Sequence, residues 1–100
     1  MKFRFHHEAS EEYLKSVAFY DEEQRGLGWR FVQAVEEGIE TVMDEPERWR
    51  CFDGPLRRHL VDSFPFHLIY GVRADEVVFV AVAHCSRKPG FWKQRFEDHP

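Results

Sequence analysis

Residues 66–84 read FHLIYGVRADEVVFVAVAH. Phe66, Leu68 and Tyr70 occur at every second position, which is the period of a strand with one buried face. After a short polar break, residues 77–84 are apolar at nearly every position. Such a run is typical of a central strand that is covered on both faces. These residues therefore predict two adjacent antiparallel strands joined by a tight connection.

A further strand is expected at 57–62, because a Ser-Phe-Pro turn at 63–65 separates it from the strand that follows. Three consecutive strands with short connections predict an antiparallel meander. At the start of the chain, Phe3 and Phe5 alternate with polar residues. We therefore expect one more strand at 2–6, with these two rings on its buried face.

Two helices are expected between the first strand and the meander. Ser10 is the expected cap of the first helix, with Glu11 and Glu12 in its first turn. The apolar stripe of the first helix is Ala9, Tyr13, Val17 and Tyr20. A break at 25–28 separates the helices, and the apolar stripe of the second is Leu27, Phe31, Val35, Ile39 and Val42. Pro46 ends the second helix, because proline disfavours helical geometry in the residue before it.

The predicted fold class is α+β, with the order β-α-α-β-β-β. A helical hairpin packs on a mainly antiparallel four-stranded sheet. Pro89 and Gly90 end the sheet, and residues 91–96 are expected to form a short C-terminal helical turn. At 100 residues, the chain corresponds to a single domain at 1–100.

The composition bounds the class of protein. Hydrophobic residues make up 43% of the chain, and the formal net charge is −4. No apolar run is long enough to span a bilayer, and residues 1–7 lack the apolar stretch of a secretory signal. We therefore expect a cytoplasmic protein that does not bind membranes. Cys51 and Cys85 have no CxxC spacing and are expected to stay reduced.

The net charge is unevenly distributed. Residues 1–47 carry 12 acidic and 5 basic residues, whereas residues 48–100 carry 6 acidic and 9 basic residues. This asymmetry predicts one acidic face and one basic face. A surface that attracts an anionic partner can come only from the second half of the chain.

Several common chemistries are excluded by missing motifs. The sequence contains no Walker A pattern, no GxGxxG and no HExxH. His6 and His7 are adjacent in the first predicted strand, where they would point to opposite faces. The other four histidines are scattered along the chain. We therefore expect neither a metal site nor a cofactor.

The residues that follow the central strand could carry chemistry. Residues 84–92 read HCSRKPGFW, and further basic or titratable residues lie on the neighbouring strands: Arg57, Arg58, His59 and His67. A metal-independent RNA-cleaving site needs a general base, a general acid and cations around the phosphate. His84, Arg87 and Arg58 are the catalytic candidates for such a site. The alternative is structural: His84 satisfies a buried backbone group, and Arg87 pairs with a carboxylate.

Two motifs resemble a known family. Residues 57–73, RRHLVDSFPFHLIYGVR, are similar to the "R…L…FPY…IxY" pattern of the RelE/ParE toxin superfamily, and HCSRKPGFW resembles its "HxxRxPxxW" ending. The helical hairpin follows the same plan, with Ala9, Tyr20, Leu27, Gly28, Phe31 and Pro46. The resemblance covers nearly the whole chain.

The resemblance implies the toxin half of a type II toxin–antitoxin pair, a kind of protein also described as a plasmid stabilisation protein. Its partner would be a cognate antitoxin whose disordered segment folds as it wraps the toxin, giving a hetero-oligomer. RelE-like members of the superfamily cleave mRNA in the ribosomal A site, whereas ParE-like members poison DNA gyrase. A third possibility is an inactive member that only binds its antitoxin.

Comparison with the RelE-type site favours the ParE-like interpretation. Arg87 matches the family's arginine after the last strand. The other RelE-type positions hold Arg58 and Leu60 in place of two lysines, His67 in place of an arginine, and Lys93 in place of a tyrosine. The acidic total also disfavours ribosome binding. Some ribosome-dependent members use a histidine near the end of the last strand, so His84 keeps the nuclease alternative open.

The sequence thus predicts a partner-binding surface on the sheet. Its expected residues are Arg57, Arg58, His67, Arg87, Phe91, Trp92 and Lys93. We expect Arg57, Arg58, His84 and Arg87 to lie near one another on the side of the sheet away from the helical hairpin. The ring of Trp92 is expected at the rim of this surface or, alternatively, as an apolar plug at the sheet's edge.

Overall fold

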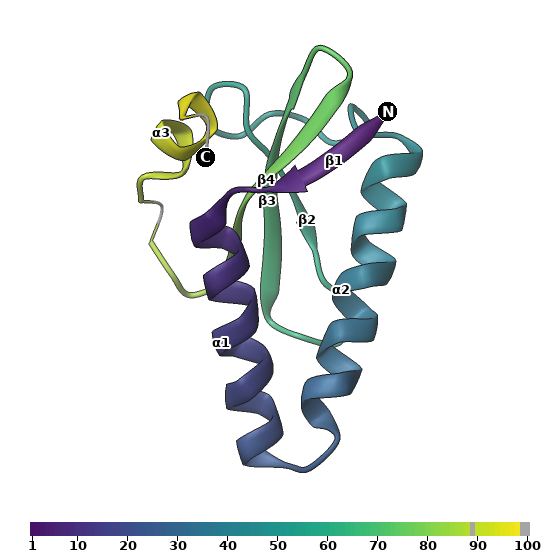
Figure 1. Ribbon diagram of the computed structural model, residues 1–100. Coiled ribbons are helices and arrows are strands. Elements are labelled where there is room, and N and C mark those ends of the chain that lie inside the picture. Colours follow the sequence, from purple (N-terminus) through teal and green to yellow (C-terminus); the bar gives the residue numbers. More distant parts are fainter. Residues whose placement is uncertain (89, 99–100) are drawn as a thin grey trace.

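The computed structural model describes residues 1–88 and 90–98 (Figure 1). Pro89, which belongs to the HCSRKPGFW motif, lies outside the described residues, as does His99. The elements follow in the predicted order: β1 (Lys2–Phe5), α1 (His7–Glu23), α2 (Leu27–Asp44), β2 (Arg57–Leu60), β3 (Phe66–Arg73), β4 (Glu76–His84) and α3 (Trp92–Glu97). The α+β fold class and the short C-terminal helix are confirmed.

The four-stranded sheet has the order β1-β4-β3-β2. β1 runs parallel to β4, and the other neighbouring strands are antiparallel. β4 is the central strand predicted from its apolar run, and its residues from Val77 to Ala83 are buried. A register shift lies between Ile69 and Tyr70 of β3. The sheet is therefore mixed but mainly antiparallel, as predicted.

The helical hairpin of α1 and α2 covers one face of the sheet. Phe31, Val35 and Val42 of α2 are fully buried in a core that they share with residues of β3 and β4. The helices approach each other closely at Gly28, where a Cβ atom would lie 2.7 Å from the Val17 carbonyl oxygen. A side chain at this position would separate the helices, so the hairpin requires glycine there.

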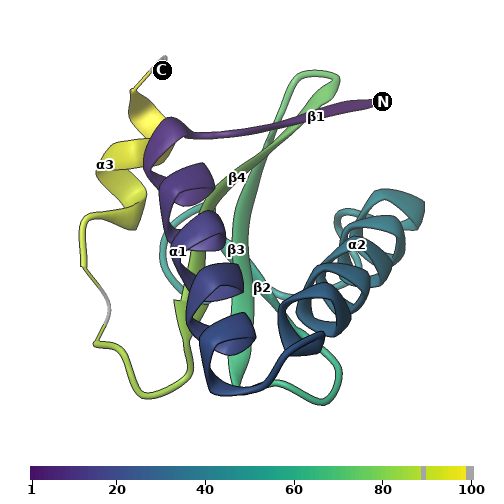
Figure 2. The ribbon, with the colours of Figure 1, turned by 60° about the horizontal axis from the view of Figure 1, so that its bottom comes forward.

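α3 packs on the opposite face, and Figure 2 shows it across the sheet from α2. Trp92 and Phe96 of α3 are buried against Val78, Val80 and other residues of the sheet. At Gly71 of β3, a Cβ atom would overlap the Phe96 ring. Both faces of the central strand are therefore covered, one by the hairpin and the other by α3.

Three expectations about boundaries are corrected. α1 begins at His7, not after Ser10, and its cap is His6, whose Nδ1 accepts a hydrogen bond from the Glu8 amide at 3.2 Å. Ser10 donates its own amide to the His6 carbonyl as part of the first turn. β1 ends at Phe5 because His6 already serves as this cap. β2 ends at Leu60, because the chain then turns through Ser63 with a φ of 69°.

Within the part of the chain that the structure describes, no helix has the length and apolarity needed to cross a membrane.

Candidate functional site

The structure does not bring the four expected residues together on one face. Arg57 lies opposite Tyr70, which belongs to the hairpin-side core, whereas Arg58 lies opposite Ile69 on the α3 side. His84 lies opposite Phe66, and their ring centroids are 5.3 Å apart on the hairpin side. The expectation is wrong because adjacent residues of a strand point to opposite faces.

Arg57 stabilises the loop between α2 and β2. Its Nη1 donates to the carbonyl oxygens of Glu47 and Trp49, and its Nη2 lies 4.0 Å from the Glu47 carboxylate. The side chain is only 18% exposed. Its Nη1 is thus used within the protein, and because the side chain is mostly buried it offers little to a partner as folded.

Arg58 belongs to an open surface beside β2. We call this the β2-side surface, defined by Trp49, Arg50, Cys51, Phe52 and Arg58, which line a pocket of about 370 Å³. The Arg58 guanidinium lies 4.7 Å from the centroid of the Phe52 ring. Among the described residues, no carboxylate pairs with Arg50 or Arg58. This surface therefore presents two unpaired cations beside aromatic rings, a combination suited to binding anionic or planar groups.

The histidines near this surface are neutral at pH 7. Burial lowers the pKa of His67, and the nearby Arg58 and His59 lower it further. Burial also lowers the pKa of His59, together with Arg48. His67 therefore does not replace the positive charge of the arginine found at its position in the RelE-type site.

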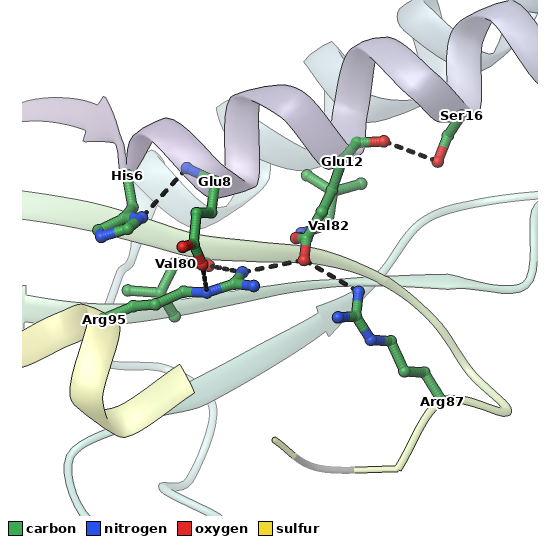
Figure 3. A network of polar contacts seen from close by, with 8 residues as sticks. All are labelled: His6, Glu8, Glu12, Ser16, Val80, Val82, Arg87 and Arg95. Carbon is green, nitrogen blue, oxygen red and sulfur yellow. Dashed lines mark hydrogen bonds and ion pairs between the residues drawn. The ribbon is translucent and has the colours of Figure 1, made fainter. Parts of the chain in front are cut away.

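A second group of arginines lies where the C-terminal arm, residues 85–88 and 90–98, meets α1 (Figure 3). Arg87 and Arg95 of the arm both bind Glu12 of α1. Glu12 Oε2 accepts from Arg87 Nη1 at 2.9 Å and lies 2.9 Å from Arg95 Nη1. Its other oxygen, Oε1, accepts from the Val82 amide of β4 at 3.1 Å. One carboxylate thus joins the helix, the central strand and the arm.

Arg95 is the buried member of this group. Its side chain is 10% exposed, its Nε lies 2.7 Å from Glu8, and its Nη1 donates to the Val80 carbonyl at 2.8 Å. The sequence analysis missed Arg95 and its glutamate partners. One signal was available: Arg95 lies three residues after Trp92 and directly before Phe96, on the buried face of a helical turn.

Arg87 has fewer partners than Arg95 and is more exposed. It is 49% exposed and has Glu12 as its carboxylate partner. The predicted structural alternative, an Arg87–carboxylate pair, is confirmed. The corresponding alternative for His84 is wrong, because His84 is exposed and its Nδ1 accepts from the exposed Ser86 amide at 3.1 Å. Ser86 Oγ lies 2.7 Å from the same nitrogen, and among the described residues none forms a hydrogen bond with His84 Nε2.

The arm's remaining candidate residues differ in exposure. Trp92 is 5% exposed: its ring is an apolar plug, but it packs on the α3-side face of the central strands and not at the sheet's edge, so it is not available to a partner in this conformation. Phe91, immediately before it, is 76% exposed. Lys93 lies 3.5 Å from Asp53 in a largely exposed ion pair. Phe91 and Lys93 are therefore accessible, and Trp92 is not.

Comparison with known proteins identifies the fold. No protein-family model matches the sequence, and no curated protein matches it. A solved chain from the structure titled "Chromosomal ParDE TA system from P. aeruginosa" matches with a TM-score of 0.75 at 12% identity. The match covers 84% of this chain and 95% of that chain. This likeness shows that the chain shares its fold with that solved chain.

Proposed function

We propose that the protein is the toxin component of a type II toxin–antitoxin pair, neutralised in the cytoplasm by a cognate antitoxin. The observation that carries this proposal is the likeness, over 84% of the chain, to a chain of a ParDE system. The two sequence motifs at 57–73 and 84–92 support it, because they resemble the same superfamily in order and spacing. A fold alone does not define an activity, so the target is argued from the site.

Within this class, we propose a ParE-like action on DNA gyrase. Two observations on cations support the proposal over ribosome-dependent cleavage. His67 is neutral at pH 7, since burial lowers its pKa, and Leu60 is uncharged, so two RelE-type cationic positions lack charge. The guanidinium of Arg87, which matches the remaining arginine, is partly neutralised by Glu12. RNA binding depends strongly on such charges.

The proposed contacts with the antitoxin or the target are Arg58 and His67 near β2, and Arg87, Phe91 and Lys93 on the arm. Arg58 and Phe91 have the clearest claim, because both are exposed, whereas the exposed Arg87 and Lys93 each pair with a carboxylate of the protein. Arg57 and Trp92 serve the fold instead, through the loop contacts and the buried packing described above.

One observation favours the alternative, a RelE-like mRNA endonuclease. The exposed His84 has its Nδ1 occupied by Ser86, which orients the ring and leaves Nε2 available as a general acid or base. In this case His84, Arg87 and Arg58 would be the catalytic group. Arg58 lies on the α3 side of the sheet and His84 on the hairpin side, so the RNA would have to contact residues from both faces.

Induced expression distinguishes the two targets. A ParE-like toxin is expected to cause filamentation and a DNA-damage response while translation continues, and the purified protein should inhibit supercoiling by gyrase. Primer extension on a reporter transcript is the decisive measurement. Cuts at ribosome-occupied codons would overturn the gyrase proposal.

The antitoxin is tested separately. Co-expression with the neighbouring small open reading frame, followed by affinity pull-down of the tagged protein, should recover a co-purifying peptide and restore growth. If neither target is affected but the neighbouring peptide still binds, the protein is an inactive antitoxin-binding member.

A further inference from the structure

The contact between Arg87 and Glu12 has an unusual asymmetry. Glu12 is 15% exposed, and it also holds Arg95 and the Val82 amide. Arg87 is 49% exposed and relies on Glu12 alone among the described carboxylates. In Figure 3, Arg87 reaches Glu12 from the loop side, whereas Arg95 lies beneath α1. Loss of this contact therefore has very different consequences for the two partners.

If Arg87 moves away, Glu12 does not become an unpaired buried charge. Its carboxylate keeps the ion pair with Arg95 Nη1 and the hydrogen bond from the Val82 amide. A buried charge that loses its only partner is costly, but one that keeps a guanidinium and an amide is not. The guanidinium of Arg87, in turn, is half exposed and can bind any oxyanion that presents the same two-oxygen geometry as a carboxylate.

We infer that Glu12 is an internal competitor for Arg87: in the free protein its carboxylate holds the guanidinium, and an external oxyanion takes the guanidinium from it. Arg95 is the permanent anchor of the arm, and Arg87 is the exchangeable one. This competition is a property of the isolated chain, so it does not rest on the proposed toxin function. It sets how strongly Arg87 can bind a phosphate or carboxylate group.

The geometry provides a matched pair of variants. Glu12→Gln removes the competing charge but keeps an oxygen that can accept from the Val82 amide. Glu11→Gln removes the same charge from the neighbouring residue, which is exposed and pairs with no cation among the described residues. Both glutamates line the same pocket as Arg87, so both variants change its long-range electrostatics in a similar way.

The test is a titration with inorganic phosphate at pH 7, at ionic strength matched with sodium chloride, followed by NMR of the arginine Nε–Hε signals. The Arg87 signal should shift with phosphate. In Glu12→Gln its apparent Kd should fall about two- to fivefold, the range that a half-exposed ion pair implies. In Glu11→Gln it should change by less than about 1.5-fold, as a screened exposed charge implies.

An equal effect of the two variants, or weaker phosphate binding in Glu12→Gln, would overturn the inference. If Glu12→Gln does not fold, the phosphate titration of the wild-type protein provides an independent test. Phosphate should then shift the Arg87 signal and leave the Arg95 signal unchanged. If both signals move together, or if neither responds, Arg87 is not exchangeable and the inference is wrong.

Discussion

Two regions of the molecule use arginine in opposite ways. At the junction between α1 and the C-terminal arm, Arg87 and Arg95 each pair with glutamates of α1. At the β2-side surface, Arg50 and Arg58 lie beside aromatic rings and pair with no described carboxylate. The comparison teaches that a basic residue in this fold contributes to stability or to a binding surface according to the hydrogen-bond acceptors that surround it.

The largest effect on the free energy of unfolding is expected for substitution of Arg95. Arg95→Gln should lower the free energy of unfolding by about 2 to 4 kcal/mol, because the buried Val80 carbonyl loses its charged donor and Glu8 and Glu12 lose the cation between them, while Glu12 keeps Arg87 and the Val82 amide. Arg58→Gln should change it by less than about 0.5 kcal/mol, as is usual for an exposed surface residue. Urea unfolding followed by circular dichroism measures both. Equal losses would remove the distinction between the two regions.

Arg57 tests whether the contribution of an arginine to stability depends on the strand in which it lies or on the contacts that its side chain makes. It is adjacent to Arg58 but hydrogen-bonded to the carbonyl oxygens of Glu47 and Trp49. Arg57→Gln should cost roughly 1.5 to 3 kcal/mol, the contribution of hydrogen bonds to a charged group. The same unfolding measurement, with Arg58→Gln as the control, should place Arg57 with the structural arginines. A loss below that of Arg58→Gln would contradict this assignment.

The junction should also be sensitive to pH through His6. Burial lowers the pKa of His6, with a further contribution from His7, so the folded state binds its proton less readily than the unfolded chain. Its contribution to stability is therefore complete above the unfolded pKa of about 6.5 and is lost as the pH falls below it. Protonated Nδ1 cannot accept from the Glu8 amide, which removes a helix cap worth about 1 kcal/mol.

His6→Asn keeps a side-chain acceptor that does not titrate, and it should reduce the loss of stability between pH 7 and pH 5. The pKa values of His59 and His67 are also lowered by burial, so part of the pH dependence should remain. Unfolding free energies measured across this pH range give the difference. An unchanged pH profile in His6→Asn would show that the cap does not titrate.

The smallest change in stability is expected at the β2-side surface, where the change in binding should be clearest. Arg50→Gln and Arg58→Gln should each leave the unfolding free energy within about 0.5 kcal/mol of the wild type. Each should nevertheless weaken capture of the co-expressed antitoxin or relieve toxicity. Arg25→Gln, at an exposed residue between α1 and α2, is the control. If it relieves toxicity equally, net charge and not this surface is responsible.

The elements of the fold were predictable because their sequence periods are strong. The apolar stripe of α2 and the continuous apolar run of β4 leave little choice of structure, and both are confirmed. The cap of α1 was not predictable, because serine is the usual capping residue, whereas here the Nδ1 of an extended His6 accepts the hydrogen bond. Capping propensity favoured Ser10, but the helix begins directly after β1, so His6 is the residue that caps it.

The site was less predictable than the fold. The face on which Arg57 and Arg58 lie depends on strand register, and a one-residue change in register exchanges the two. The partners of Arg87 and Arg95 lie on α1, far away in the sequence, and no local pattern connects them. Sequence reasoning could identify which residues are basic. It could not identify which of them were already paired.

The pairing of β1 with β4 has a consequence for biosynthesis. Lys2 lies opposite Glu76, so β1 finds its partner only after β2, β3 and β4 have been made. Contacts between residues so distant in the sequence form late and slow the folding of a chain. During translation the hairpin of α1 and α2 is complete long before β4 and the arm can cover the remaining core. The nascent chain is therefore without its finished sheet, and without the Glu12 junction, until β4 and the C-terminal arm have left the ribosome.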